Sequence, residues 1–288
     1  MKVSERAANM EALKNLLPDT RLTEIIDVGA NPIDGTPPYR NMLNAGLCNV
    51  TAFEPQENAL AKLNLAKGPR ERYFPFAVGD GGLHTLHIFR GSGWASLLDI
   101  DPASMNVFQH FRPYAELIEQ KPVQTLRLDD IEEIQCMDFL KIDIQGGELS
   151  VFKNAKKALS KAVFVQTEIS FVPLYAGQPG FGEVDMELRS QGFIPHCFGM
   201  PVETRPISPL VFDNQPWKGL HQLVEADMVY VRDFRKPDLL STEMLKQMAM
   251  VAHCCYASVD LVLHCLLILA ERGIISQETC REYLFGKG

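Results

Sequence analysis

Short apolar runs alternate with longer amphipathic stretches along the first two thirds of the chain. Four runs are almost continuously apolar, as in strands buried on both faces of a parallel sheet; they are residues 23–29, 50–54, 139–144 and 162–168. Residues 73–78 are interpreted as a further strand. The stretches between the runs carry apolar residues at helical spacing, such as Leu60 and Leu63 after Pro55. This alternation predicts an α/β fold with a mostly parallel sheet.

Two parts of the chain differ from this alternation. Residues 83–89 and 123–128 alternate polar and apolar side chains, which predicts half-exposed strands. After a helix predicted at 181–190, residues 193–198 and 227–231 form two strands separated by a proline-rich insertion and no helix. We therefore expect the last strand to be antiparallel, at the edge of the sheet.

Helices are predicted at both ends of the chain. Apolar spacing over residues 4–17 predicts a helix that ends before Pro18. From Leu239 to Leu266 apolar residues recur every three or four positions, which predicts one long amphipathic helix, and a short final helix follows Gly273. The chain is thus divided into an N-terminal helix, a sheet domain and a helical C-terminal extension: residues 1–21, 22–238 and 239–288. The extension packs either on the sheet domain or on a second subunit, which would make a homodimer.

Composition narrows the range of functions. The 288 residues carry a net charge of −8, with 36 acidic and 28 basic side chains. Because Lys and Arg provide the affinity for phosphate backbones, we expect no nucleic-acid partner. The most apolar segment, Val259 to Ala270, is interrupted by Asp260 and His264. It is also shorter than the roughly 20 residues of a transmembrane helix, so no membrane span is expected.

The cysteines indicate a cytoplasmic location and no metal site. There are seven, an odd number, with no Cys-x-x-Cys pair and no signal peptide before them, which is typical of a reduced compartment. The pairs His253-Cys254 and His264-Cys265 would lie about 16 Å apart along one helix, too far to share one ion. We interpret them as packing residues.

Residues that can carry chemistry gather at predicted strand ends. The strand 23–29 runs into Gly29-Ala30-Asn31, a turn in which Gly permits positive φ and Asn tolerates it. Such a turn exposes backbone N–H groups at the carboxyl edge of the sheet, where open α/β sheets bind ligands. Glu54 ends the next strand, a position that suits a carboxylate accepting hydrogen bonds from the two hydroxyls of a ribose. The pair predicts a nucleoside site.

Five short motifs follow one another along the chain: Ile-Ile-Asp-Val-Gly-Ala-Asn at 25–31, Phe-Glu-Pro at 53–55, Ala-Val-Gly-Asp at 77–80, Leu-Asp-Asp at 128–130 and Leu-Lys-Ile-Asp-Ile-Gln-Gly-Gly-Glu-Leu at 140–149. Together they resemble the FkbM family of S-adenosylmethionine-dependent methyltransferases, over about residues 22–233. The resemblance implies a class I methyltransferase sheet of seven strands with the last one antiparallel. It also implies S-adenosylmethionine as cofactor and O-methylation of a hydroxyl on a sugar or a natural-product-like small molecule.

The resemblance also implies roles for single residues. The candidates for cofactor binding are Asp27, Gly29, Ala30, Asn31, Glu54, Pro55, Gly79, Asp80 and Asp143. Of these, Asp27 takes the cofactor's ammonium or fixes the loop, Asp80 contacts the adenine, and Asp143 faces the sulfonium. Methyl transfer to a hydroxyl also needs a proton acceptor. Asp143 is the first catalytic candidate, as general base or substrate orienter, and Glu168 is the second.

Structural roles compete with these assignments. Asp27 and Glu54 could cap neighbouring helices, Asp80 could close an Asx turn, and Asp143 could be a helix N-cap. Glu168 is as well explained by a structural role as by a catalytic one.

The chain departs from the family pattern in two places. Pro32-Ile33-Asp34 lengthen the loop before Gly35, where the family usually has a glycine two residues after the Asn. Gln145-Gly146-Gly147-Glu148 stands where Glu-Gly-Ala-Glu is frequent, which removes a charge beside the expected chemistry. This change bears on substrate preference or on metal handling. Trp94 and Tyr39 either wall the substrate pocket or pack in the core.

The sequence is also compatible with two other functions and with a bound metal ion. A nicotinamide dehydrogenase would also use an acidic residue after the second strand, but Gly-x-Gly-x-x-Gly is absent. A non-catalytic scaffold that keeps the cofactor pocket is the other alternative, suggested by Gln145. A divalent metal ion would need Asp143 together with Asp129 or Glu168.

Overall fold

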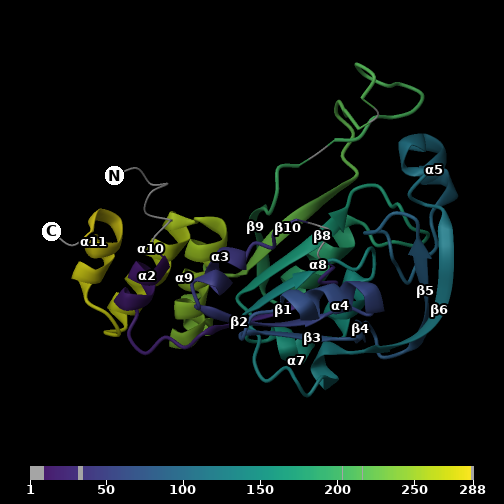
Figure 1. Cartoon of the computed structure of the whole chain (residues 1–288). Coiled ribbons are helices and arrows are strands. Elements are labelled where there is room, and N and C mark those ends of the chain that lie inside the picture. Colours follow the sequence, from purple (N-terminus) through teal and green to yellow (C-terminus); the bar gives the residue numbers. More distant parts are fainter. Residues whose placement is uncertain (1–9, 32–34, 203, 216, 287–288) are drawn as a thin grey trace.

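The centre of the molecule is a seven-stranded sheet with the order β3-β2-β1-β7-β8-β10-β9 (Figure 1). The computed structural model describes residues 10–31, 35–202, 204–215 and 217–286. The strands of this sheet are β1 Thr23–Val28, β2 Cys48–Phe53, β3 Glu71–Phe74, β7 Phe139–Ile142, β8 Phe164–Ser170, β9 Phe193–Phe198 and β10 Glu225–Arg232. β10 is antiparallel to both neighbours, and the other pairs are parallel. The predicted α/β sheet with its last strand antiparallel is confirmed.

The antiparallel strand does not lie at the edge of the sheet, and that part of the prediction was wrong. β9 forms the edge, and β10 lies between β8 and β9. Helix α8 (Phe181–Ser190) leads from β8 to β9 at the edge of the sheet, which leaves room for one strand between β8 and β9. The segment 199–224 then returns the chain to this position, where β10 forms. We call the described part of this segment, residues 199–202, 204–215 and 217–224, the arm, which rises above the sheet in Figure 1.

Helices cover both faces of the sheet, so the central strands are buried on both sides. Ile25 and Ile26 of β1 point to opposite faces, and both are at most 2% exposed. Ile26 joins a core formed with α6 (Glu148–Lys153), α7 (Lys156–Leu159) and α8. Ile25 joins a second core formed with α2 (Met10–Leu16), α3 (Arg40–Asn44), α4 (Glu57–Ala66) and the C-terminal helices.

The C-terminal part is a layer of the core rather than an appendage. Helix α9 (Thr242–Tyr256) buries Leu245, Met248 and Val251 against the sheet and is followed by α10 (Val259–Glu271). The prediction of one continuous helix was wrong, because the chain breaks at Ala257, which has a left-handed φ of 51°. The predicted short final helix is confirmed as α11 (Gln277–Phe285).

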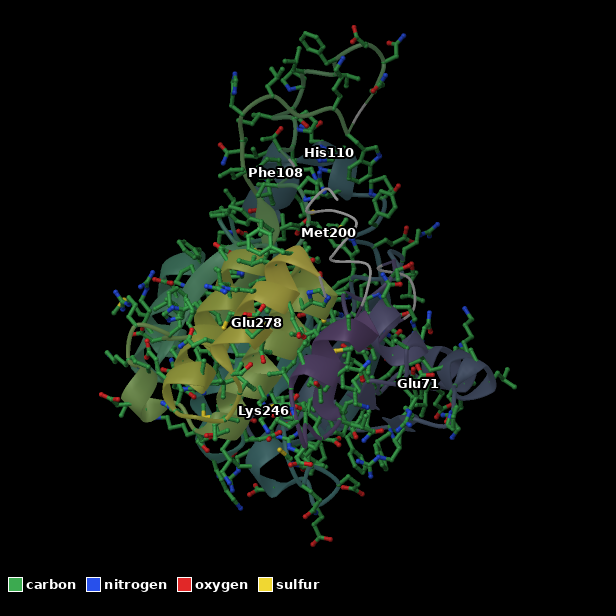
Figure 2. The ribbon with its side chains drawn as sticks, turned by 90° about the vertical axis from the view of Figure 1, so that its left-hand side faces the viewer. Glu71, Phe108, His110, Met200, Lys246 and Glu278 are labelled. Carbon is green, nitrogen blue, oxygen red and sulfur yellow. The ribbon has the colours of Figure 1, made fainter. Side chains whose placement is uncertain are left out.

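Both ends of the described chain meet beside these helices. Helix α11 packs against α2 (Figure 2), and Lys246 of α9 donates to the carbonyl oxygen of Pro18 at 2.5 Å. The first residues of the predicted N-terminal helix, 4–9, lie outside the described residues. In the part of the chain that the structure describes, no helix is long and apolar enough to cross a membrane.

A small second sheet, in the order β4-β6-β5, stands beside the main one. Its strands are β4 Ala77–Val78, β5 Leu83–Phe89 and β6 Leu117–Leu126. The strand predicted at 73–78 is in fact two strands in different sheets. Pro75 separates them, because it has no N–H group with which to continue the ladder. The prediction for 83–89 is confirmed, whereas the strand predicted at 123–128 begins earlier, at Leu117.

Two short helices extend from this second sheet toward the arm. They are α5 (Pro102–Val107) and the 3-10 helix η1 (Gln109–Phe111). The backbone N–H of Ser208 in the arm donates to the carbonyl oxygen of Val107 at 2.9 Å. The arm, α5 and η1 thus stand together above the carboxyl ends of the central strands.

Candidate functional site

The turn after β1 is packed so tightly that only glycine fits. Gly29 has a φ of +77°, and a Cβ atom there would lie 1.8 Å from the carbonyl oxygen of Asp143. The N–H groups of Gly29 and Ala30 both donate to the carbonyl oxygen of Phe53, at 3.0 and 3.2 Å. These two amides therefore tie β1 to β2, and are not the free donors that the sequence led us to expect.

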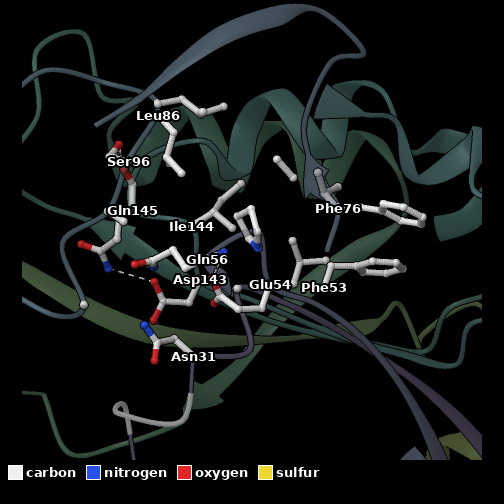
Figure 3. Close-up of a pocket in the computed structure, with 18 of the residues that line it drawn as sticks. Asn31, Phe53, Glu54, Gln56, Phe76, Leu86, Ser96, Asp143, Ile144 and Gln145 are labelled. Atoms are coloured by element: carbon white, nitrogen blue, oxygen red, sulfur yellow. Dashed lines mark hydrogen bonds between the residues drawn. The ribbon is translucent and has the colours of Figure 1, made fainter. Parts of the chain in front are cut away.

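A cavity of about 660 Å³ opens at the carboxyl ends of β1, β2 and β7 (Figure 3). We call it the first cavity; its lining includes Gly29, Asn31, Glu54, Pro55, Gln56, Phe76, Ala77, Val78, Ser96, Asp143, Ile144 and Gln145. Glu54 is 2% exposed, and its Oε1 accepts the backbone N–H of Gln56 at 2.8 Å. The rings of Phe53, Phe74 and Phe76 stack with centroids 5.6–6.1 Å apart beside it. The cavity combines apolar walls with a few placed polar groups, as ligand sites do.

Asp27 lies on the other side of the strand end. Its Oδ2 accepts the Tyr39 hydroxyl at 2.5 Å, and Lys141 Nζ lies 3.5 Å from its Oδ1. Asp27 and Ala30 line a smaller neighbouring cavity. Asp27 is therefore held by two side chains of this chain. Tyr39 is a core residue, 2% exposed.

Asp80 forms an Asx turn outside both of these cavities. Its Oδ1 accepts the backbone N–H of Gly82 and contacts His84 Nε2, both at 2.8 Å. The hydrogen bond from His84 lowers the pKa of Asp80. Gly79 donates its N–H to the carbonyl oxygen of Leu126 and also lies outside the cavity lining. Phe76, which sequence reasoning missed, lines the cavity at this point.

A second, wider cleft of about 1640 Å³ adjoins the first cavity and shares Ser92, Gly93, Asp143 and Gln145 with it. Its aromatic walls come from three parts of the chain: Trp94, Phe111 with Tyr114, and Trp217 of the arm. The ring centroids of Trp94 and Phe111 lie 5.2 Å apart, and those of Trp217 and Tyr114 5.4 Å apart. The polar lining includes Asp143, Gln145, Glu168, Arg205, Glu225 and Asp227.

Asp143 and Glu168 are joined by Gln145. The Nε2 of Gln145 donates to Asp143 Oδ1 at 2.9 Å (the dashed line in Figure 3) and to Glu168 Oε2 at 3.1 Å. Burial, reinforced by the negative charges of Asp143 and Glu225, raises the pKa of Glu168 well above its usual value. Glu168 lies within β8, which continues to Ser170. Asp143, Gln145 and Glu168 thus form one polar group where the first cavity meets the second cleft.

The same group has the residue types of a metal site, but a side-chain amide lies where an ion would bridge two of its carboxylates. Carboxylate oxygens of Asp143, Glu148 and Glu168 lie within 4.8 Å of one another. Both oxygens of Glu148, however, accept backbone N–H groups, from Ile144 at 2.8 Å and Gly146 at 3.0 Å. The Gln145 amide stands between the other two carboxylates, so this donor set does not fit a divalent cation.

Asp129, the other metal ligand considered from the sequence, has a structural role away from the site. Its carboxylate accepts the backbone N–H groups of Lys157 and Ala158 at the start of α7. The loop insertion Pro32-Ile33-Asp34 lies outside the described residues.

A seven-stranded sheet in this order, with a cavity at the carboxyl ends of β1 and β2, defines the class I methyltransferase fold. Residues 27–195 match the Methyltransferase FkbM domain, which is more than half of the chain. The protein therefore belongs to the FkbM methyltransferase family.

Three similar proteins illustrate this relationship. The chain is 32% identical over 162 residues to the 2-O-methyltransferase NoeI of Sinorhizobium fredii; the match covers 54% of this chain and 66% of NoeI, just under two thirds of that relative. Magnesium protoporphyrin IX methyltransferase from Synechocystis PCC 6803, solved with bound SAM, is 12% identical, with coverage of 80% and 77% and a TM-score of 0.38. A TehB-like SAM-dependent methyltransferase from Corynebacterium glutamicum is 13% identical, with coverage of 78% and 87% and a TM-score of 0.35.

Proposed function

We propose that this protein is an S-adenosylmethionine-dependent O-methyltransferase that acts on a hydroxyl of a small-molecule or carbohydrate acceptor. One observation carries the proposal: the first cavity and the second cleft meet at Asp143 and Gln145. A cofactor in the first and an acceptor in the second would bring their reacting atoms together at this junction. Such positioning is the main task of a methyltransferase, and proximity is worth up to about 7–11 kcal/mol of the barrier.

The first cavity would hold the cofactor. Glu54, buried at the end of β2, would accept hydrogen bonds from the ribose hydroxyls, with Pro55 beside it. Gly29 and Asn31 would border the methionine part, and the apolar wall around Phe76 would take the adenine. Gly79 and Asp80 do not line this cavity and have no part in the proposed site. Asp27 and Ala30 would support the loop from the neighbouring cavity.

The chain's own groups would position the acceptor and take its proton. When bound, the cofactor supplies an activated methyl group on a sulfonium sulfur. Asp143 borders both hollows, so it would orient the acceptor hydroxyl toward that methyl group. As the oxygen–carbon bond forms and the carbon–sulfur bond breaks, the hydroxyl proton would pass to Glu168. The raised pKa of Glu168 makes its ionised form a strong proton acceptor.

The second cleft suits an acceptor with both apolar faces and hydroxyls. The rings of Trp94, Tyr114 and Trp217 offer flat apolar walls, and the carboxylates of Glu168, Glu225 and Asp227 offer hydrogen-bond acceptors. A sugar ring has this combination of surfaces. The similarity to NoeI, a 2-O-methyltransferase, supports transfer to oxygen.

The cofactor assignment can be tested by calorimetry. We expect saturable binding of S-adenosylhomocysteine and none of NAD. Glu54→Ala should weaken this binding roughly 10- to 100-fold, because it removes hydrogen bonds to a charged group. Glu57→Ala, on the exposed start of α4, is the matched control and should bind like the wild type.

The outcomes separate the competing functions. Binding of NAD alone would replace the proposal with a dehydrogenase. Binding of S-adenosylhomocysteine without methyl transfer to any of a panel of sugars and other hydroxyl acceptors would favour a non-catalytic scaffold.

A further inference from the structure

The backbone at Gln145 is held in a conformation that its residue type disfavours. Its φ is +58°, in the left-handed region, and Gly146 after it has a φ of +104°. A residue with a long side chain is disfavoured in this region, which Gly or Asn would occupy more easily. The side chain of Gln145 must therefore have a role that offsets this unfavourable backbone conformation.

That side chain has a fixed orientation. The hydroxyl of Tyr175, which is 1% exposed, donates to Gln145 Oε1 at 2.8 Å. With the oxygen held there, the Nε2 end faces Asp143 and Glu168. The Oγ of Ser96 donates to the backbone carbonyl oxygen of Gln145 at 2.6 Å and holds the turn itself (Figure 3). Three segments of the chain thus cooperate to aim one amide group.

The target of the amide is a concentration of negative charge. Asp143, Glu148 and Glu168 offer carboxylate oxygens within 4.8 Å of one another. Backbone N–H groups bind both oxygens of Glu148, which leaves Asp143 and Glu168 to repel each other across the reaction site. An amide nitrogen has two N–H donors and can bind both carboxylates at once.

Resting on the proposed function, we propose that Gln145 is a positioning residue whose amide takes the place of a bridging divalent cation between Asp143 and Glu168. It holds the two carboxylates in one arrangement toward the acceptor without a metal ion. The corollary is that a single change of amide to carboxylate should convert the group into a cation site. Gln145→Glu keeps the shape and the hydrogen bond from Tyr175, removes both N–H donors, and adds a carboxylate that faces Asp143 and Glu168.

Manganese binding tests this inference without any turnover. The full-length chain is titrated with Mn²⁺ and followed by electron paramagnetic resonance, with circular dichroism to verify folding. We expect no saturable site in the wild type and one in Gln145→Glu. Gln145→Met, of similar length but neutral and without donors, should bind none, and adding Glu168→Gln to Gln145→Glu should abolish the new site.

Kinetics test the positioning role once an acceptor is known. Gln145→Met should lower kcat by about 100-fold, the effect expected of misplaced catalytic groups, with a smaller change in KM. Gln145→Glu should depend on added Mn²⁺ or Mg²⁺ and be inhibited by a chelator, whereas the wild type should be insensitive to it. If the proposed function were wrong, methyl transfer would be absent but the manganese results would still stand.

Two results would overturn the inference. One is saturable Mn²⁺ binding by the wild type as tight as that of Gln145→Glu, and the other is a folded Gln145→Glu that binds none. Should Gln145→Glu fail to fold, the wild type supplies a further measurement. The side-chain amide protons of Gln145 should exchange slowly with solvent in nuclear magnetic resonance spectra and lose that protection in Tyr175→Phe; fast exchange in the wild type would contradict the bridge.

Discussion

At the residue scale, Glu148 shows how burial and hydrogen bonding compete. It is 5% exposed and accepts two backbone N–H groups, which favour its charged form. Burial has the larger effect and raises its pKa to about 7. At neutral pH this carboxyl group is therefore close to the midpoint of its titration, and one of its oxygens lies within 4.8 Å of oxygens of the proposed catalytic pair.

Glu148 should make stability depend on pH. Its pKa is about 7 in the folded state, against an ordinary value of 4.5 for a glutamate in the unfolded chain, so the folded state binds more protons between these values. The stabilisation is complete below pH 4.5 and is lost as the pH rises through 7, by about 3 kcal/mol in all. Denaturant unfolding at several pH values should show this loss in the wild type and not in Glu148→Gln. Parallel curves for the two proteins would mean that Glu148 keeps an ordinary pKa.

The sequence located part of the candidate site and not the rest, for a physical reason. Glu54 and Asp143 border the first cavity because parallel strands end at one edge of a sheet, which a sequence pattern can reveal. Tyr175 and Trp217 come from segments whose positions depend on how the loops fold. Of the residues that sequence reasoning missed in the first cavity, Phe76 had a local signal in the Phe-Pro-Phe run at 74–76.

At the element scale, chain breaks without glycine or proline were the hardest to foresee. Pro75 marks the break between β3 and β4 in the sequence itself. The break between α9 and α10 has no such mark, since apolar residues continue at helical spacing across it. The chain turns because Ala257 adopts a left-handed conformation and the Ser258 N–H bonds the carbonyl oxygen of Ala252 at 2.9 Å.

Replacing Ala257 with glycine should increase the stability of the protein. A left-handed φ of 51° costs a residue with a Cβ atom about 1 kcal/mol, and glycine avoids this cost. Ala257→Gly should raise the free energy of unfolding by several tenths of a kcal/mol, after the greater entropy of the unfolded glycine is subtracted. Ala61→Gly, at an exposed position inside α4, is the matched control and should lower stability by about 1 kcal/mol. Equal destabilisation by both changes would contradict the left-handed turn.

At the scale of the whole molecule, α9 packs on the sheet of its own chain, one of the two surfaces that the sequence left open, and a homodimer stays a prediction. Its apolar side chains are buried against β1, β7 and β8 of the same chain. Periodicity identifies which face of a helix is apolar, but it cannot identify the surface that covers that face. The C-terminal layer is therefore part of the core on which the proposed site stands.

Truncating one buried side chain of this layer should destabilise the protein. Leu245→Ala, at a position with 0% exposure, should lower the free energy of unfolding by about 2–5 kcal/mol because it leaves a cavity. Leu239→Ala, 74% exposed just before the helix, should change it by less than about 0.5 kcal/mol. Chemical denaturation followed by tryptophan fluorescence would measure both, and a small loss for Leu245→Ala would argue against a packed α9 layer.

The pairing of α2 with α11 has a practical consequence. These helices lie together at one end of the molecule, and the small β4-β6-β5 sheet, α5 and the arm lie at the other (Figure 1). A biotin group on an exposed residue of α11, such as Glu278, would anchor the protein to a sensor chip by the end remote from both hollows. The first cavity and the second cleft would then stay accessible to the flowing buffer, so that many acceptors could be screened one after another on a single surface.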